Sequence, residues 1–286
     1  MDLSIIIVTW NSQKQIKNNL QSLLKSKTDF SYEIFVVDNN SSDQTVEIIK
    51  NEFPTVNLIV NDANLGFAKA NNQAIKKVQG DFVLLLNPDM KVNEDTLDKM
   101  IQWMQTHQNA FVASCKLVDE NGQIIKHVRR FPTFFDQMAI IKKIPHIFPG
   151  ILNKYLQKNF DYNQESVVDS IRGSFFMIRK TAIAKLGLLD ERYFLWLEEV
   201  DYCKRVYQAG GQVWYAPICQ CQDYIGQSFK QVVGLQKQKY FRNSMLTYFQ
   251  KWHPKWQYFL LKAAWPFGIF LAWLAEKLKW KTKNVT

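Results

Sequence analysis

Four short apolar runs, separated by amphipathic stretches, alternate along the first part of the chain, and this alternation limits the possible folds more than any other feature. The runs are residues 4–8, 32–37, 56–60 and 82–86. Each has the length and the aliphatic or β-branched content of a buried strand, and the stretches between them carry apolar residues at helical spacing. Repeated strand–helix units of this kind form a parallel sheet with right-handed crossovers. We therefore predict an α/β fold.

Polar side chains follow each of the four predicted strands. They are Thr9 and Asn11, then Asp38, then Asn64, and finally Asn87 with Asp89. Open α/β sheets bind ligands at this edge, outside the carboxyl ends of their strands. Neither a GxGxxG fingerprint nor a Walker A lysine motif is present, so a phosphate here would need a metal ion or a basic side chain. Asn-Pro-Asp alone is a common turn, but four polar clusters in succession indicate a nucleotide cleft.

The composition is typical of a folded cytoplasmic protein. The 286 residues are 47% hydrophobic and suit one large domain or two closely joined ones. The four cysteines form no CxxC pair and predict reduced thiols. The N-terminus has neither the basic segment nor the cleavage site of a signal peptide.

The net charge of +10 is concentrated in the last part of the chain, where residues 224–286 contain eleven Lys or Arg and one acid. Residues 263–275 are uncharged and rich in Trp and Phe. As a helix they would span ~20 Å, short of the ~30 Å hydrocarbon core of a membrane, and Pro266 would interrupt a span. We predict a helical segment that lies on an anionic membrane surface. Packing on the catalytic part, or self-association into a homo-oligomer, stays open; without a nucleic-acid-binding motif, no nucleic acid partner is expected.

The middle of the chain is less regular. Residues 111–118 predict a strand, whereas residues 129–163, with three prolines, predict either a mobile loop on the acceptor side or an ordinary surface excursion. A further strand is interrupted at Gly173 and is followed by an acidic cluster that leads into a helix. In this helix Asp201 and Arg205 stand four residues apart, which predicts a structural ion pair.

Seven short motifs occur in order between residues 4 and 228. They are Val8-Thr9-Trp10-Asn11, Val36-Val37-Asp38-Asn39-Asn40-Ser41, Asn64-x-Gly66-Phe67-Ala68-x-Ala70-Asn71, Asn87-Pro88-Asp89, Gly173-Ser174-Phe175-Phe176-Met177-Ile178-Arg179, Leu189-Asp190-Glu191 and Glu198-Glu199-x-Asp201-x-Cys203-x-Arg205. Together they resemble the family-2 inverting glycosyltransferases with a GT-A fold, most closely the bacterial rhamnosyltransferase-like branch.

This resemblance implies a division of the chain. Residues 1–228 would form a GT-A catalytic domain. Its Rossmann-like nucleotide-sugar-binding half, residues 1–110, would be fused to an acceptor-binding half, residues 111–228. Residues 229–286 would form a basic, aromatic and amphipathic helical region that associates with a membrane or with a second copy of the chain.

The resemblance also assigns roles to the donor side. Thr9, Asn11 and Asp38 would hold the donor nucleotide, with Asp38 accepting from the pyrimidine ring N–H. Asn64, Lys69 and Asn87 would lie along the donor.

The metal ligand would be Asp89, which matches the last acid of the family's DxD motif, while Asn87 replaces the first acid. One carboxylate with diphosphate oxygens suits Mg²⁺ or Mn²⁺. Asp223 stands where the family usually has a metal-binding His. A carboxylate is a competent ligand for a hard cation, so Asp223 would either bind the metal or be a solvated residue of a site that has lost this ligand.

Glu199 matches the catalytic base of the family, and Glu198 is the competing candidate. An inverting transfer needs a base within ~2.6–3.2 Å of the attacking hydroxyl group, because that group loses its proton as it attacks. Trp196, Gly173 and Ser174 would lie on the acceptor side with Glu198.

The resulting prediction is a metal-assisted inverting sugar transferase at the inner face of the cell membrane. It would move a sugar to a hydroxyl group of a lipid-linked or growing surface polysaccharide. The favoured donor is dTDP-rhamnose, and UDP-linked hexoses, amino sugars or galactofuranose are the alternatives. Two other classes stay open. A nucleotidyltransferase would need a Gly-rich phosphate loop that residues 9–12 lack, and a non-catalytic protein of transferase fold is favoured only by Asp223.

Overall fold

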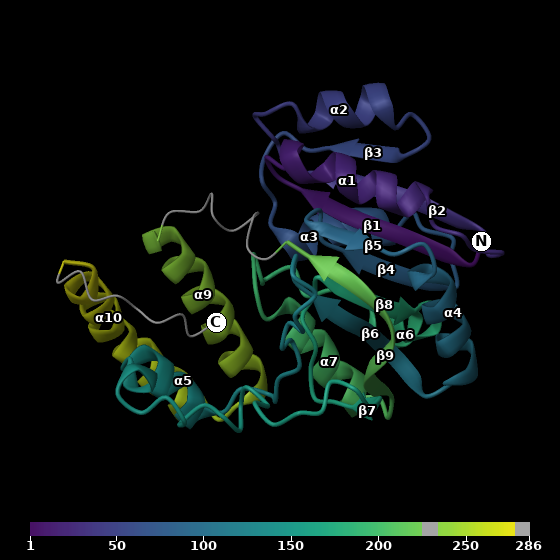
Figure 1. The fold of residues 1–286 in the computed structure, drawn as a ribbon. Coiled ribbons are helices and arrows are strands. Elements are labelled where there is room, and N and C mark those ends of the chain that lie inside the picture. Colours follow the sequence, from purple (N-terminus) through teal and green to yellow (C-terminus); the bar gives the residue numbers. More distant parts are fainter. Residues whose placement is uncertain (225–233, 278–286) are drawn as a thin grey trace.

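The computed structural model describes residues 1–224 and 234–277 (Figure 1). The end of the predicted catalytic domain, residues 225–228, and the part of the basic C-terminal region after residue 277 lie outside these residues. In the described part, nine strands form one mixed sheet in the order β3-β2-β1-β4-β8-β6-β9-β5, and β7 pairs with β9. The strands are β1 (Leu3–Thr9), β2 (Tyr32–Asp38), β3 (Asn57–Val60), β4 (Phe82–Leu86), β5 (Met90–Val92), β6 (Ala110–Val118), β7 (Ser166–Val167), β8 (Phe175–Arg179) and β9 (Gln212–Asp223).

Helices connect these strands and continue beyond them. They are α1 (Gln13–Leu24), α2 (Thr45–Glu52), α3 (Phe67–Ile75), α4 (Thr96–Thr106), α5 (Phe134–Ile141), the short 3₁₀ helix η1 (Ile144–His146), α6 (Lys180–Leu186), α7 (Glu198–Gln208), α9 (Gly234–Trp252) and α10 (Lys255–Lys277).

The first half of the sheet is parallel, as the alternation of strands and helices predicted. β3, β2, β1 and β4 pair in parallel, and each agrees with its predicted range to within one residue at either end. Thr9 lies opposite Asp38, and Asp38 lies opposite Val60. The loops after these strands therefore open on the same edge of the sheet.

The second half of the sheet is antiparallel to the first half where β8 meets β4. The Asn87 N–H donates to the Ser174 carbonyl oxygen at 3.0 Å. β9 runs antiparallel to β5, with Met90 opposite Asp223. The turn after β4 is therefore enclosed by the chain before β8 on one side and by the end of β9 on the other.

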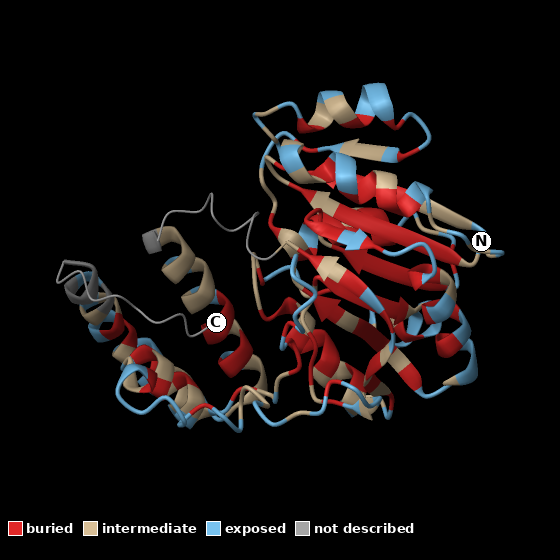
Figure 2. Ribbon diagram, viewed as in Figure 1, coloured by how far each residue is buried: buried red, intermediate tan, exposed pale blue. Residues whose placement is uncertain are grey.

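Helices cover both faces of the sheet. On one face α1 and α4 contribute Leu20 and Met100 to the core, and on the other α3 and α7 contribute Ala74 and Val206. Figure 2 shows the central strands buried between these layers. The four cysteines are buried free thiols. The predicted division at residues 110 and 228 stays a prediction.

Helices α5, α9 and α10 form a helical layer beside the sheet (Figure 1). A third apolar core joins Phe249 of α9, Trp265 of α10 and Ile141 of α5 with Leu197, which directly precedes α7. The predicted helical character of the C-terminal region is thus confirmed for its described residues, and this layer is packed on the chain that leads into α7.

The prediction for residues 129–163 missed helix α5. Thr133 and Asp136 form a capping box, in which the Asp136 N–H donates to the Thr133 hydroxyl oxygen at 3.3 Å and the Asp136 carboxylate accepts from the Thr133 N–H at 3.0 Å. This Thr-x-x-Asp pattern was the available sequence signal. The helix also depends on contact with α10, where a Cβ added at Gly268 would come 2.8 Å from the Ile141 side chain. No local pattern predicts such a distant contact.

Helix α10 continues through Pro266, the residue that we expected to interrupt a membrane span. Proline removes one backbone donor, and the carbonyl group left without a partner is tolerated where water can reach it. Pro266 is exposed, which meets that condition. Among the described residues, no helix combines the length and the apolar character that crossing a membrane requires.

Candidate active site

The buried carboxylate of Asp38 holds the loop after β2. Its Oδ1 accepts from the Thr9 hydroxyl at 2.9 Å and from the Ser41 hydroxyl, and its Oδ2 accepts from the Ser41 N–H at 2.8 Å. Asp38 is fully buried, so these bonds satisfy a group that burial would otherwise destabilise. The structure brings Thr9 and Asp38 together, as predicted, and uses the carboxylate to order the loop.

Asn11 joins the loop after β1 to this arrangement. It has a positive φ of 50°, a conformation that asparagine adopts more readily than most residues. Its N–H donates to the Ser41 hydroxyl oxygen at 2.8 Å, and its Oδ1 accepts from the Ser42 N–H at 2.7 Å. The loops after β1 and β2 are therefore hydrogen-bonded to each other.

The loop after β3 meets the chain that leads into α7. Asn64 Oδ1 accepts from the Gly66 N–H at 3.0 Å. Gly66 has a φ of 82°, and a Cβ there would lie 2.5 Å from the Phe194 carbonyl oxygen, so only glycine fits this close approach. The Phe67 N–H donates to the same oxygen at 2.8 Å. Lys69 is exposed on α3.

Hydrogen bonds from α1 fix the turn that carries Asp89. Asn19 Nδ2 donates to the Asn87 carbonyl oxygen at 3.1 Å and to the Met90 carbonyl oxygen at 2.8 Å. Asp89 is 4% exposed and lines a pocket of about 290 Å³ together with Lys14 of α1. We call this the donor-side pocket.

Asn19 is a positioning residue that the sequence analysis did not single out. Helical spacing places it with Ile16, Leu20 and Leu23 on the buried face of α1. A polar side chain on such a face needs a buried hydrogen-bond partner, and this was the signal that could have identified it.

Asp223 lies beside the Asp89 turn and is paired with Arg172. The Tyr224 N–H donates to the Asp89 carbonyl oxygen at 3.0 Å, which places Asp223 on the neighbouring strand. Arg172 Nη1 lies 3.4 Å from Asp223 Oδ2. Burial raises the pKa of Asp223, and the positive charge of Arg172 partly offsets this shift. Arg172 directly precedes the Gly173-Ser174 motif and was not predicted as a site residue.

The donor set at this turn fits a cation that binds together with phosphate. No group of three or more His, Cys, Asp or Glu side chains that could hold a metal ion occurs within residues 1–224 and 234–277. Mg²⁺ is usually held by one or two carboxylates with substrate phosphates completing its shell. Asp89, with Asp223 on the adjacent strand, matches that pattern.

Helix α7 begins at the two candidate bases. Trp196 and Leu197 precede it with φ values of 67° and 69°, a left-handed conformation that costs non-glycine residues about 1–3 kcal/mol each and often occurs at functional sites. Glu198 is only 5% exposed, whereas Glu199 is partly exposed. Burial raises the pKa of both carboxyl groups, and the neighbouring charge of Glu199 raises the pKa of Glu198 further. The positive charge of Arg172 lowers the pKa of Glu199 and partly offsets the effect of burial.

The predicted acceptor-side residues lie in two different places: Gly173 and Ser174 lie beside Glu199 and Asn87, and Trp196 lies at a separate pocket. A Cβ at Gly173 would lie 3.6 Å from the Glu199 Cβ, an ordinary contact distance, so Gly173 lies directly against Glu199. Ser174 is buried and its carbonyl oxygen binds Asn87. Trp196 instead lines a different pocket, between α5, α9 and α10.

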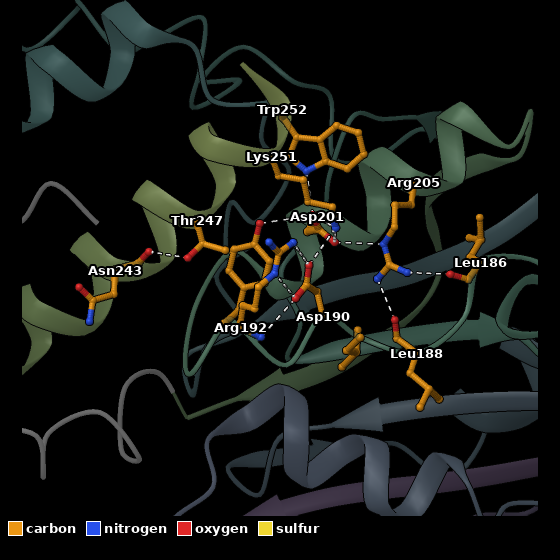
Figure 3. A network of polar contacts seen from close by, with 12 residues as sticks. Leu186, Leu188, Asp190, Arg192, Asp201, Arg205, Asn243, Thr247, Lys251 and Trp252 are labelled. Carbon is orange, nitrogen blue, oxygen red and sulfur yellow. Dashed lines mark hydrogen bonds and ion pairs between the residues drawn. The ribbon is translucent and has the colours of Figure 1, made fainter. Parts of the chain in front are cut away.

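The predicted ion pair between Asp201 and Arg205 is confirmed, and it belongs to a larger network (Figure 3). Asp201 also accepts from Lys251 and, at 2.7 Å, from the Trp252 indole N–H. Lys251 in turn lies 3.0 Å from Asp190. Because Lys251 and Trp252 belong to α9, this network fastens the helical layer to α7 and is structural.

Comparison with known proteins gives a consistent result. A sequence model described as "Glycosyl transferase family 2" matches residues 4–187, more than half of the chain. Rhamnosyltransferase WbbL of Escherichia coli (strain K12) is 29% identical over 221 residues, which cover 74% of this chain and 80% of that protein. N-acetylglucosaminyl-diphospho-decaprenol L-rhamnosyltransferase of Mycobacterium tuberculosis (strain ATCC 25618 / H37Rv) is 26% identical over 235 residues, which cover 75% and 73% of the two proteins.

Solved structures show the same architecture. The mannosyltransferase PcManGT from Pyrobaculum calidifontis, in complex with GDP-Man and Mn²⁺, has a TM-score of 0.58 and 15% sequence identity, and the match covers 96% of this chain and 75% of that one. At this level of identity the likeness concerns the fold alone.

Proposed function

The chain belongs to glycosyl transferase family 2, and from this membership we propose that it transfers L-rhamnose from dTDP-rhamnose, with inversion, to a hydroxyl group of a lipid-linked or growing surface polysaccharide. It is a glycosyltransferase with a GT-A fold. Two relatives named as rhamnosyltransferases support rhamnose as the sugar. Because the structural neighbour carries GDP-Man, the fold does not select the donor, and a UDP-linked sugar is the alternative.

The observation that carries this proposal is the continuity between the Asp89 turn and Glu199. Asn87 of the turn bonds to the Ser174 carbonyl oxygen, and the adjacent Gly173 lies against the Glu199 side chain. Asp89, proposed to hold the leaving diphosphate, is thus connected to Glu199, proposed to activate the acceptor. The connection runs through Asn87, Ser174 and Gly173.

On the donor side, the bonded loops around Asp38 would receive the nucleotide. A carboxylate accepts at about four positions, and three of them are used by Thr9 and Ser41. The proposed bond from the pyrimidine N–H would take the fourth. Since Asp38 is fully buried, this bond requires the loop at Ser41 to shift when the donor binds.

Asp89, with Asp223 beside it, would hold Mg²⁺ or Mn²⁺ together with the donor diphosphate. When bound, this cation supplies positive charge that stabilises the departing nucleoside diphosphate.

On the acceptor side, Glu199 would take the proton of the attacking hydroxyl group. Glu199 is partly exposed and Glu198 is buried, although one carboxylate oxygen of each is enclosed without a hydrogen-bond partner among the described residues. Burial raises the pKa of Glu199, and a base whose pKa approaches the working pH is more effective than an ordinary carboxylate. Burial raises the pKa of Glu198 as well, so the greater exposure of Glu199 is the feature that favours it.

We also propose that α10 holds the protein at the inner, cytoplasmic face of an anionic membrane. Its outer face exposes large apolar side chains to an extent that is unusual away from binding surfaces. They are Trp256 (52%), Phe259 (61%), Leu260 (49%), Phe267 (53%), Phe270 (53%) and Trp273 (47%). Exposed Lys255 and Lys262 lie among them, which suits anionic head groups.

A panel of nucleotide sugars tests the donor and the metal together. With Mn²⁺ present, we expect dTDP-rhamnose to raise the melting temperature and to be hydrolysed slowly, and we expect neither effect in EDTA. Asp89→Ala should abolish the ion-dependent stabilisation, and Asp95→Ala, an exposed acid at the start of α4, should preserve it. Stabilisation of equal size without a divalent ion would contradict the role of Asp89, and a stronger response to a UDP-sugar would replace the proposed donor.

A further inference from the structure

A pocket of about 270 Å³ lies within the helical layer, away from the donor-side pocket. Its walls come from α5, α9 and α10 and from Trp196, which precedes α7. The residues of this helical-layer pocket that matter here are Lys143, Trp196, Lys237, Gln238, Trp265 and Gly268. It is slightly smaller than the ~300–1,000 Å³ usual for small-molecule sites, so it suits the head of a long ligand better than a whole one.

Two lysines give this pocket a positive charge. Among the described residues, neither Lys143 nor Lys237 takes part in an ion pair. Lys143 has a φ of 57°, a strained conformation for lysine, and burial lowers its pKa. An anion bound between two partly buried cations without a carboxylate partner would be favourable.

Apart from Gln238, the remaining walls are apolar or aromatic, and they include an unused donor. Trp265 is 3% exposed, and its indole N–H has no hydrogen-bond partner among the described residues. Phe267, which adjoins the pocket residue Gly268 in α10, is exposed. A ligand that fits must therefore be anionic at one end and apolar at the other.

The pocket is also close to the proposed base. Trp196 stands three residues before Glu199, so their Cα atoms are at most about 11 Å apart. The chain between them is fixed by the Ser244 hydroxyl, which donates to the Leu195 carbonyl oxygen at 2.7 Å, and by Leu197 in the core of the helical layer.

We infer that the helical-layer pocket binds the diphosphate of a lipid-linked acceptor, with Lys143 and Lys237 on the phosphates and the apolar chain running out over α10. The acceptor sugar would then project past Trp196 toward Glu199. This inference rests on the proposed function and adds to it the acceptor class and the place where that acceptor is held.

The test is a binding measurement with geranyl diphosphate on the full chain, in EDTA so that no cation at Asp89 takes part. Calorimetry should show binding to the wild type and little binding of geraniol or inorganic pyrophosphate, since each lacks one half of the ligand. Lys143→Gln and Lys237→Gln should each weaken the binding at least about fivefold, the effect of one charge-assisted bond. Gln238→Glu, which keeps the size and adds a negative charge, should weaken it more.

Lys142→Gln and Lys239→Gln are matched controls, because these exposed lysines adjoin the same helices without lining the pocket. They should change the affinity less than twofold. Equal weakening in all four lysine variants would overturn the inference, because it would indicate general attraction of the diphosphate to a basic surface. Absence of binding to the wild type would overturn it as well.

Two further measurements separate the possible sources of an anion. If Lys143→Gln and Lys237→Gln release the protein from anionic phospholipid vesicles but leave geranyl diphosphate binding unchanged, the pocket holds membrane head groups and the acceptor assignment is wrong. Hydrolysis of dTDP-rhamnose should be unchanged in the control variants Lys142→Gln and Lys239→Gln, whose side chains lie outside the pocket. Its absence in the wild type would count against the proposed function alone, since the binding measurement does not depend on it.

Discussion

The loops after β1, β2, β3 and β4 form one edge of the sheet, which we call the nucleotide edge after its proposed ligand. This edge and the helical layer differ in the forces that hold them. At the nucleotide edge, short loops are fixed by polar side chains, such as Asp38 and Asn19, that bond to neighbouring hydroxyl and backbone groups. In the helical layer, large apolar side chains such as Phe249 and Trp265 pack together, and one buried ionic network attaches them to α7. The first region presents defined acceptors and donors, and the second presents an apolar and basic surface.

This difference fits the two substrates of the proposed reaction. A nucleotide has a fixed set of hydrogen-bonding groups, which a rigid polar edge can match. A lipid-linked acceptor offers a diphosphate and a long apolar chain, which an amphipathic helical surface can match. Helix α7 contacts both regions, because its first turn carries Glu199 and its Asp201 binds α9.

Removal of the base should have the largest effect, because it acts where the two regions meet. We expect Glu199→Gln to lower kcat by about 10³-fold, within the range known for loss of a general base. Donor-induced stabilisation in the presence of Mn²⁺ should be unchanged, since the nucleotide edge remains intact. Single-turnover kinetics and thermal shift measure the two effects separately.

Glu198→Gln is the matched control for this variant. Because Glu198 is buried, we expect its substitution to change kcat less than tenfold. If the two variants lose activity equally, or if only Glu198→Gln loses it, the assignment of the base is wrong.

The two regions also differ in how far the sequence predicts them. The nucleotide edge follows from local patterns, since each polar cluster comes directly after a strand that periodicity identifies. The strands up to Leu86 and the positions of Thr9, Asp38 and Asp89 at their ends could therefore be predicted.

The helical layer could be predicted only in part. The helical character of residues after 234 follows from composition, but α5 depends on contact with α10, and Pro266 is tolerated because it is exposed. Arg172 becomes part of the site only because β8, β9 and α7 converge on it. Such relations are set by tertiary packing between distant segments, which no local pattern contains.

Loss of the ionic network should have the second-largest effect. Asp201→Asn leaves the partly buried Arg205 and Lys251 without their shared, fully buried carboxylate, and breaking a buried pair costs about 3–5 kcal/mol. We expect the free energy of unfolding, measured by chemical denaturation, to fall by about 3 kcal/mol.

Asp95→Asn removes the exposed ion pair of Asp95 with Lys99, also four residues apart, and provides the comparison. Exposed pairs contribute less than about 1 kcal/mol. A similar loss of stability in both variants would show that the network does not hold the helical layer in place.

Substitutions on the outer face of α10 should have a smaller effect, confined to membrane binding. Phe259→Ser, Phe267→Ser and Phe270→Ser together should weaken binding to anionic vesicles at least about tenfold, because exposed apolar area provides much of such affinity. Turnover of a soluble acceptor should be unchanged. Co-sedimentation with vesicles measures the first effect.

Leu24→Ser, which changes a similarly exposed apolar residue of α1 (47% exposed), should leave vesicle binding unchanged. If the α10 substitutions leave vesicle binding intact but convert an oligomer into a monomer by light scattering, the face is an interface between two copies of the chain, and the membrane proposal is wrong.

The smallest expected effect concerns the electrostatic connection between the two regions. Burial raises the pKa of Glu199, so kcat/KM should fall as the pH decreases through that raised value, where the base becomes protonated. The positive charge of Arg172 lowers this pKa. Arg172→Gln should therefore move the acidic limb of the pH profile to higher pH. Arg130→Gln, which removes a nearby exposed charge, should leave the limb in place. An unchanged limb in Arg172→Gln would mean that the residue serves Asp223 alone and that the base titrates independently of the donor side.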